Sequence, residues 1–109
     1  MNHITLRGYV ANDPYISKGK GKKAVASFSL GVPDRSAKKN EEGNYPSDFF
    51  QLVAFAPYAE VIEKYVEKGS ELLVSGRLAT STYDNKDRET KHVVQVIIGN
   101  MEFLSRKNA

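Results

Sequence analysis

One stretch of the sequence, Ser47–Tyr83, restricts the fold more than any other part of the chain. It begins with an alternating pattern over Asp48–Phe55, which is typical of a strand with two different faces. Pro57 then opens a short amphipathic helix, which the pair Lys68-Gly69 is expected to close. A second extended run, Leu72–Tyr83, follows directly. The order strand, short helix, strand is therefore the frame into which the rest of the chain has to fit.

Apolar patterns inside this stretch predict which side chains are buried. Phe49 and Phe55 lie six residues apart on the first strand, so both point to one face, whereas Phe50 points to the other. The pattern alone leaves open which of the two faces is the core. In the helix, apolar residues recur at the spacing of a single buried stripe, and the stripe consists of Tyr58, Val61, Ile62, Tyr65 and Val66.

The flanking segments add further strands and two polar loops. The strands are Ile4–Val10, Ala24–Val32 and His92–Leu104, and the loops are Pro33–Ser47 and Asp84–Thr90. Gly99 interrupts the last strand and is expected at a bulge or at a close approach of two backbones. Five strands with one short helix between the third and the fourth predict an all-β fold, a five-stranded Greek-key OB-fold barrel.

Length and composition limit the kind of protein further. With 109 residues the chain is expected to form one domain, assigned to residues 1–105, and residues 106–109 are expected to be a short disordered end. The absence of cysteine excludes disulfide scaffolds and cysteine zinc sites, and it suits a reducing compartment. The N-terminus has no apolar signal region, and no apolar run approaches the ~20 residues of a membrane helix. A formal charge of +3 permits an anionic partner.

Motifs for catalysis are missing from the sequence. Residues 19–23 resemble a phosphate-binding loop only superficially, because the spacing and the strand-to-helix context of that motif are absent. His3 and His92 each lack a carboxylate–histidine motif nearby, and no nucleophile has a paired base. We therefore expect a protein that is not an enzyme and that uses neither a metal nor another cofactor.

A series of short motifs runs in a fixed order along nearly the whole chain. The motifs are Asn2, Leu6-x-Gly8, Asp13-Pro14, Phe28-x-Leu30-x-Val32, Phe49, Val53, Phe55, Ala59-Glu60, Tyr65, Lys68-Gly69, Val74-x-Gly76-Arg77-Leu78, Tyr83-Asp84 and Phe103-Leu104. Each motif is common when taken singly, but the ordered set at these spacings is specific. It resembles the single-stranded DNA-binding protein family of bacteria and phages.

The resemblance implies a protein that coats and protects single-stranded DNA in replication, recombination and repair, without sequence preference. It assigns Phe49 and Phe55, together with Tyr83, to base stacking, and it makes Phe50 the better core residue. It also implies a homo-oligomer, most often a tetramer, with a dimer as the other choice. Replication and recombination proteins are further expected partners. The expected location is the bacterial cytoplasm, or the host cytoplasm for a phage protein.

Basic residues concentrate in the predicted loops, where they flank the strand face that OB folds use for binding. We expect phosphate contacts from Arg7, Lys20, Lys22, Lys23, Arg35, Lys38, Lys39, Lys86 and Arg88. The alternative for any one of them is an ordinary solvated side chain. Tyr9 shares the outward face of the first strand with Arg7, and it either joins the stacking surface or contributes to subunit pairing along Ile4–Val10.

The chain departs from the family pattern in two places. Asp34-Arg35-Ser36 occupies a region in which the family often carries another aromatic residue, and the Arg35 guanidinium is a candidate to stack in its place. The chain also stops at Ala109, whereas family members commonly continue into a linker with an acidic tip; we expect either a shortened chain or a short, phage-type member. Two other functions remain open: a primosome-type OB-fold assembly factor, and an OB-fold protein-interaction module.

Overall fold

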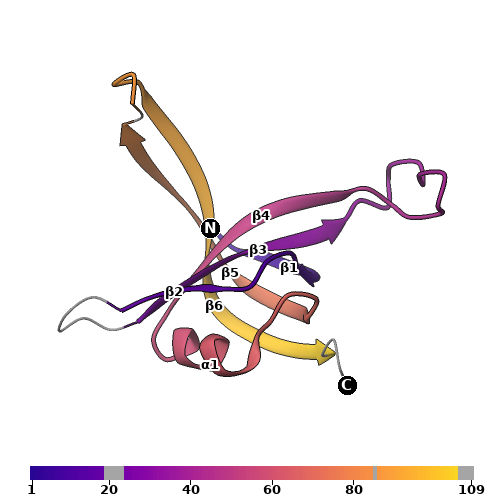
Figure 1. The fold of residues 1–109 in the computed structure, drawn as a ribbon, viewed down its shortest axis with the longest axis horizontal. Coiled ribbons are helices and arrows are strands. Elements are labelled where there is room, and N and C mark those ends of the chain that lie inside the picture. Colours follow the sequence, from indigo (N-terminus) through magenta and orange to yellow (C-terminus); the bar gives the residue numbers. More distant parts are fainter. Residues whose placement is uncertain (19–23, 85, 106–109) are drawn as a thin grey trace.

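The computed structural model describes residues 1–18, 24–84 and 86–105, except for the side chains of Tyr83 and Ser105. Strands dominate, and one short helix lies between two of them (Figure 1). The elements are β1 (Ile4–Val10), β2 (Tyr15–Ser17), β3 (Val25–Pro33), β4 (Ser47–Phe55), α1 (Tyr58–Tyr65), β5 (Glu71–Asp84) and β6 (Thr90–Ser105). The all-β prediction is confirmed, with its helix in the expected place.

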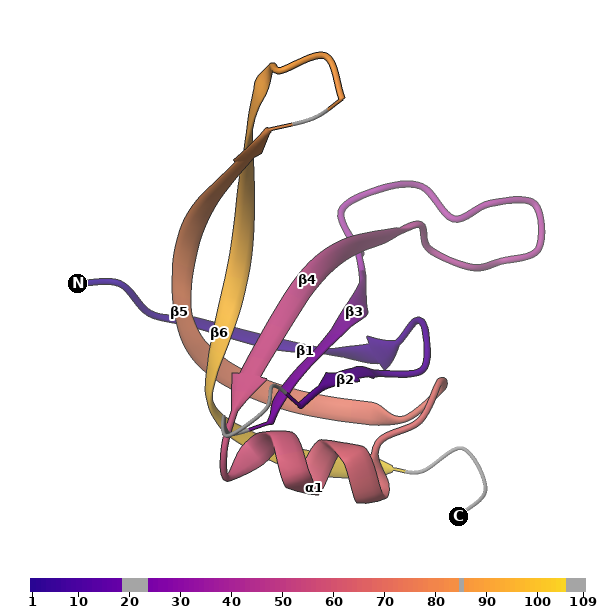
Figure 2. The same cartoon turned by 60° about the vertical axis from the view of Figure 1, so that its left-hand side comes forward.

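The strands form one sheet that curls into a ring. The strand order is β1-β5-β6-β4-β3-β2, and an additional pairing between β1 and β3 closes the barrel. All neighbours are antiparallel except β4 and β6, which run parallel. The ring contains the five expected strands; β2 is an extra strand, not predicted from the sequence, that lies at the edge beside β3. Helix α1 lies across one end of the barrel (Figure 2).

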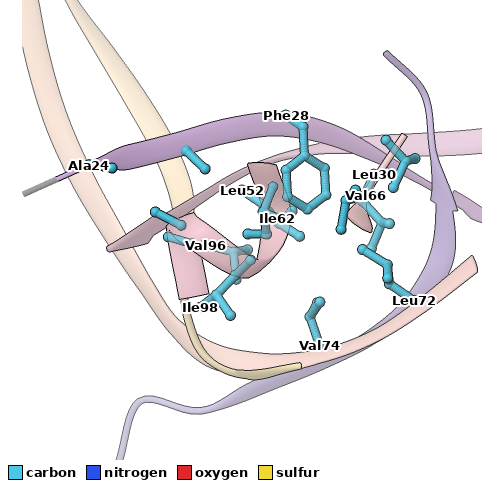
Figure 3. Close-up of a cluster of buried hydrophobic side chains, with 14 residues drawn as sticks. Ala24, Phe28, Leu30, Leu52, Ile62, Val66, Leu72, Val74, Val96 and Ile98 are labelled. Carbon is cyan, nitrogen blue, oxygen red and sulfur yellow. The ribbon is translucent and has the colours of Figure 1, made fainter. Parts of the chain in front are cut away.

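The core fills the inside of this ring. Fully buried side chains come from β3, β4, α1, β5 and β6, and Figure 3 shows them gathered between these elements. On β4, Leu52 and Ala54 are buried and Phe50 packs against the cluster. The opposite face of the strand carries Phe49 and Phe55, which are exposed. The ambiguity in the sequence is thereby resolved, since the Phe50 face is the inner one.

Two glycines allow neighbouring backbones to approach closely. A Cβ on Gly8 would meet the carbonyl oxygen of Gly31, and a Cβ on Gly76 would meet that of Ile97. Gly99 has no partner in the ladder, because the pairing of β5 with β6 shifts by one residue beside Gly76. The bulge expected at Gly99 is therefore confirmed, and it bends β5 and β6 around the barrel.

The helix is shorter than predicted. It ends at Tyr65, and the next residue, Val66, has an extended backbone with φ −96° and ψ 129°. Gly69 has a φ of 96°, but it lies in a separate turn in which the Ser70 amide donates to the Glu67 carbonyl oxygen over 3.0 Å. The prediction that Lys68-Gly69 closes the helix is wrong, because this glycine serves the turn into β5.

The buried stripe of the helix also differs from the prediction. Ala59 and Ile62 are its buried residues, and Val66 reaches the core from the extended segment that follows. Tyr65 was expected to be buried, yet it is 50% exposed and meets Phe103 edge-on at 6.4 Å between ring centroids. Val66 was also part of the predicted stripe, and it is buried as expected. No helix in the described ranges is long and apolar enough to cross a membrane.

Candidate nucleic-acid interface

The outer face of β4 presents two aromatic rings to solvent. Phe49 is 66% exposed and Phe55 is 50% exposed. Their separation of six residues corresponds to about 20 Å along an extended strand. Both rings are large and apolar, and the alternation of β4 directs both away from the core. The face between them is therefore a surface on which planar apolar groups can lie.

A glycine on β3 creates the position of the Phe49 ring. Gly31 pairs with Phe49 on one side and with Tyr9 on the other, so the three residues form one row across β4, β3 and β1. The Cε1 atom of Phe49 lies 3.1 Å from the point at which a Cβ of Gly31 would stand. The ring therefore leans over bare backbone, and Tyr9, 48% exposed, lies on the far side of it.

A second row crosses the sheet between the two phenylalanines. Tyr15, Ser27 and Val53 are cross-strand partners on β2, β3 and β4. The row continues from Val53 to Ile97 on β6 and then to Arg77 on β5. Tyr15 and Arg77 are both exposed, and neither was predicted as a site residue. Tyr15 lies in a strand too short for its alternation to be noticed, and the place of Arg77 depends on strand register, which the sequence does not display.

Most of the predicted phosphate-binding residues that the structure describes lie on two projections from the barrel (Figures 1 and 2). Arg35, Lys38 and Lys39 belong to the loop between β3 and β4, and Lys86 and Arg88 to the tip of the β5–β6 hairpin. All five are exposed, and the Lys39 ammonium stands 5.2 Å from the centre of the Tyr45 ring. Three other predicted residues, Lys20, Lys22 and Lys23, lie outside the described residues, as does the side chain of Tyr83.

Arg7 is held by a carboxylate instead of standing free. Its Nη2 and Nε atoms lie 2.7 Å and 2.9 Å from the Glu71 Oε2 atom. The Glu71 side chain is only 12% exposed, whereas that of Arg7 is 64% exposed. Both residues line a pocket of about 240 Å³ together with Tyr9 and Arg35. The negative charge of Glu71 compensates the positive charge of Arg7. Arg7 therefore attracts a phosphate less strongly than an arginine without an acidic partner, as was assumed from the sequence.

Comparison of the whole chain with known proteins identifies its family. A model of the single-strand binding protein family matches residues 1–104. The chain belongs to this family. Among its relatives, single-stranded DNA-binding protein 1 of Staphylococcus aureus is 35% identical over 109 residues, which are 100% of this chain and 69% of that protein. Single-stranded DNA-binding protein 3 of Clostridium acetobutylicum is 39% identical over 106 residues, covering 95% of this chain and 71% of that protein.

A solved structure of a member agrees with the fold. The Plasmodium falciparum SSB complex with ssDNA superposes with a TM-score of 0.83 at 28% identity, and the match covers 96% of each chain. The OB-fold architecture and the family resemblance predicted from the motif series are thus both confirmed. The comparisons assign no role to individual side chains, so the stacking and phosphate residues remain predictions.

The loop that departs from the family pattern is internally ordered. The Oδ1 atom of Asp34 accepts hydrogen bonds from the Ser36 hydroxyl at 2.5 Å and from the Ser36 amide at 3.0 Å. These bonds hold the pKa of Asp34 below its ordinary value, with the hydroxyl as the larger cause. Further along, Asn40 accepts from the amides of Glu42 and Asn44. The loop therefore carries Arg35 in a defined turn.

The described residues contain no group of three potential metal ligands among histidine, aspartate and glutamate side chains. His3 lies just before β1 at the exposed N-terminal end, where its Nε2 atom is 3.2 Å from the Thr5 hydroxyl. His3 therefore makes a local polar contact with a threonine, and this partner is not a carboxylate. The outer face of β4 offers exposed aromatic rings, and the two projections carry basic side chains among acidic ones.

Proposed function

We infer that this chain binds single-stranded DNA without sequence preference and coats it in replication, recombination and repair. The observation that carries this inference is the pair of rings, Phe49 and Phe55, exposed on one strand face in a member of the single-strand binding protein family. Every base has a π-face, so stacking on such rings tolerates any sequence and contributes about 1–3 kcal/mol per base. Tyr83, in the strand that leads to the hairpin tip, is proposed as a third stacking residue.

The phosphates are neutralised by the cations around this face. On the two projections the proposed contacts are Arg35, Lys38, Lys39, Lys86 and Arg88, and Arg7, Lys20, Lys22 and Lys23 complete the set. Lysine and arginine that displace counterions from a single strand make affinity fall with salt, with a slope of about −0.7 per phosphate contact. Their exposure leaves the described members of the set accessible to a strand that lies on the β4 face.

Further features belong to the same proposal. Residues 1–105 form the DNA-binding domain, and the chain acts by binding instead of by catalysis. The protein works as a homo-oligomer, with a tetramer favoured. The supporting feature is β1, which among the described residues pairs along Ile4–Arg7 with β5 alone. Relatives from bacteria and a sequence without cysteine suit the bacterial cytoplasm, or that of the host for a phage protein.

The decisive experiment is fluorescence anisotropy with labelled oligo-dT and with a duplex of equal length, each at two salt concentrations. Tight and salt-sensitive binding to the single strand, with weak binding to the duplex, supports the proposed function. Equal affinity for both would reduce the activity to that of a general basic surface. Binding to neither would refute the proposal and favour the alternative of an OB-fold protein-interaction module.

A further inference from the structure

Tyr15 is the most exposed of the aromatic side chains that the structure describes. It is 69% exposed, against 66% for Phe49 and 50% for Phe55. It stands on β2, the short edge strand that pairs with β3 on one side. Burying one large ring stabilises a protein by about 1.5–3 kcal/mol, so a ring left in water at a fixed place gives up a sizeable contribution to folding. Such a position suggests a partner for the ring.

The strand register puts Tyr15 on the same face as the two phenylalanines. Tyr15 pairs with Ser27, and Ser27 pairs with Val53, which lies between Phe49 and Phe55 on the outer face of β4. Direct cross-strand partners point to the same side of a sheet. Two strand spacings separate the backbones of Tyr15 and Val53, which is about 10 Å. In the register of the described strands, only the small Ser27 side chain lies between Tyr15 and Val53.

The segment that carries Tyr15 is fixed from both ends. Before it, the Asn12 side chain accepts a hydrogen bond from the Ser29 amide at 2.8 Å, and Asp13 accepts one from the Lys68 amide at 2.9 Å. After it, the Lys18 ammonium lies 3.0 Å from a carboxylate oxygen of Glu63 on α1. A ring held in place before its ligand arrives loses little conformational entropy on binding. The backbone that carries Tyr15 is therefore held in place, although the ring itself is exposed.

We propose that Tyr15 is an additional base-stacking residue, and that a single strand crosses from β4 over Ser27 to β2. This inference rests on the proposed function and extends its binding surface to an edge strand outside the closed ring. The ligand at this position is a nucleobase of the bound strand, which the ring of Tyr15 covers on one face. A tyrosine at this position adds an aromatic surface to a chain that lacks the aromatic expected near Arg35.

The sequence contains no tryptophan, which allows a reporter at this position. In a Tyr15→Trp variant, saturating oligo-dT is expected to quench the single tryptophan, because a base stacks on it. The matched control is Tyr65→Trp on α1, where the tyrosine is 50% exposed but packs edge-on against Phe103; its emission should hardly change. Tyr15→Ala should weaken oligo-dT binding by about 5- to 150-fold, the factor that corresponds to one lost stacking contact.

The outcomes separate this inference from the function on which it rests. Wild-type affinity in Tyr15→Ala, with weakened binding in Phe49→Ala, overturns the role of Tyr15 and leaves DNA binding intact. No binding of oligo-dT by the wild-type protein refutes both. A change in Tyr15→Trp emission that follows protein concentration without DNA shows that a second copy covers the ring, and this too overturns the proposal. Equal melting temperatures of the variants and the wild type ensure that affinity, and not folding, is compared.

Discussion

At the scale of single residues, two neighbours in the chain have opposite orientations. Phe49 is exposed and leans over Gly31, whereas Phe50 packs against the core cluster. The same type of side chain is therefore proposed to bind a base at position 49 and packs against the core at position 50, because successive residues of a strand point to opposite faces. A sequence pattern can establish that the two differ, but it cannot say which of them faces inward. That choice depends on the curvature of the whole sheet.

Alanine substitutions should separate these two roles. Phe49→Ala is expected to reduce oligo-dT affinity by about 1–3 kcal/mol with little loss of stability, since it removes a stacking surface and no core contact. Phe50→Ala should instead lower the free energy of unfolding by more than about 1 kcal/mol, because it leaves a void beside the core. Anisotropy and urea unfolding measure the two quantities. Loss of folding in Phe49→Ala with little change in Phe50→Ala would reverse the assignment.

The turn at Asp34 leads to a prediction for pH. Hydrogen bonds from Ser36 lower the pKa of the Asp34 carboxyl in the folded state. The stability that these bonds contribute is therefore present above the ordinary aspartate pKa and is lost as the pH falls through the lowered value. An NMR titration of the Asp34 carboxyl carbon should show the lowered midpoint. Ser36→Ala should move it upward and Ser47→Ala should leave it in place; identical midpoints in the wild type and Ser36→Ala would show that the Ser36 hydroxyl does not lower the pKa.

At the scale of elements, the sequence predicts the strands that are long enough to show a clear alternation of apolar and polar residues. The alternation of β1 and β4 extends over most of each strand, and both were found where they were expected. β2 has only three residues, too few for a period of two to stand out. The end of α1 was misplaced because Gly69 satisfies the rule for a helix end and the rule for a tight turn equally well. Only the backbone of the segment decides between them.

The bulge between β5 and β6 offers a test at this scale. A Cβ at Gly76 would meet the carbonyl oxygen of Ile97, and a backbone atom inside a ladder has little room to move. Gly76→Ala should therefore cost about 1–3 kcal/mol of folding free energy, the usual range for overpacking. Gly99→Ala is the control, because its nearest contact, the Ser75 carbonyl oxygen, is at an ordinary 3.6 Å. Urea unfolding that gave both variants the same stability would show that the close approach is absent.

At the scale of the whole molecule, the shape is more extended than the core requires. The radius of gyration is 15.2 Å, whereas a compact domain of this length would have about 13 Å. The excess comes from the loop between β3 and β4 and from the β5–β6 hairpin, which reach away from the barrel (Figure 1). The sequence shows how long the loop and the hairpin are, but the direction in which each projects depends on how the sheet closes into a ring. These projections carry basic and acidic side chains and few apolar groups, so we expect them to contribute to binding more than to folding.

Salt dependence should distinguish these cations from those elsewhere on the surface. The double variant Lys38→Ala and Lys39→Ala is expected to make the slope of log affinity against log salt less steep by about 0.7 for each lost phosphate contact, with stability unchanged. Lys64→Ala is the matched control, since Lys64 is also exposed but lies on α1, at the end of the barrel. Anisotropy with oligo-dT over a series of salt concentrations measures the three slopes. If the slope fell by the same amount for each lysine removed from the loop and from the helix, the attraction would come from the net charge of the molecule, and the projecting loop would have no separate role in holding the strand.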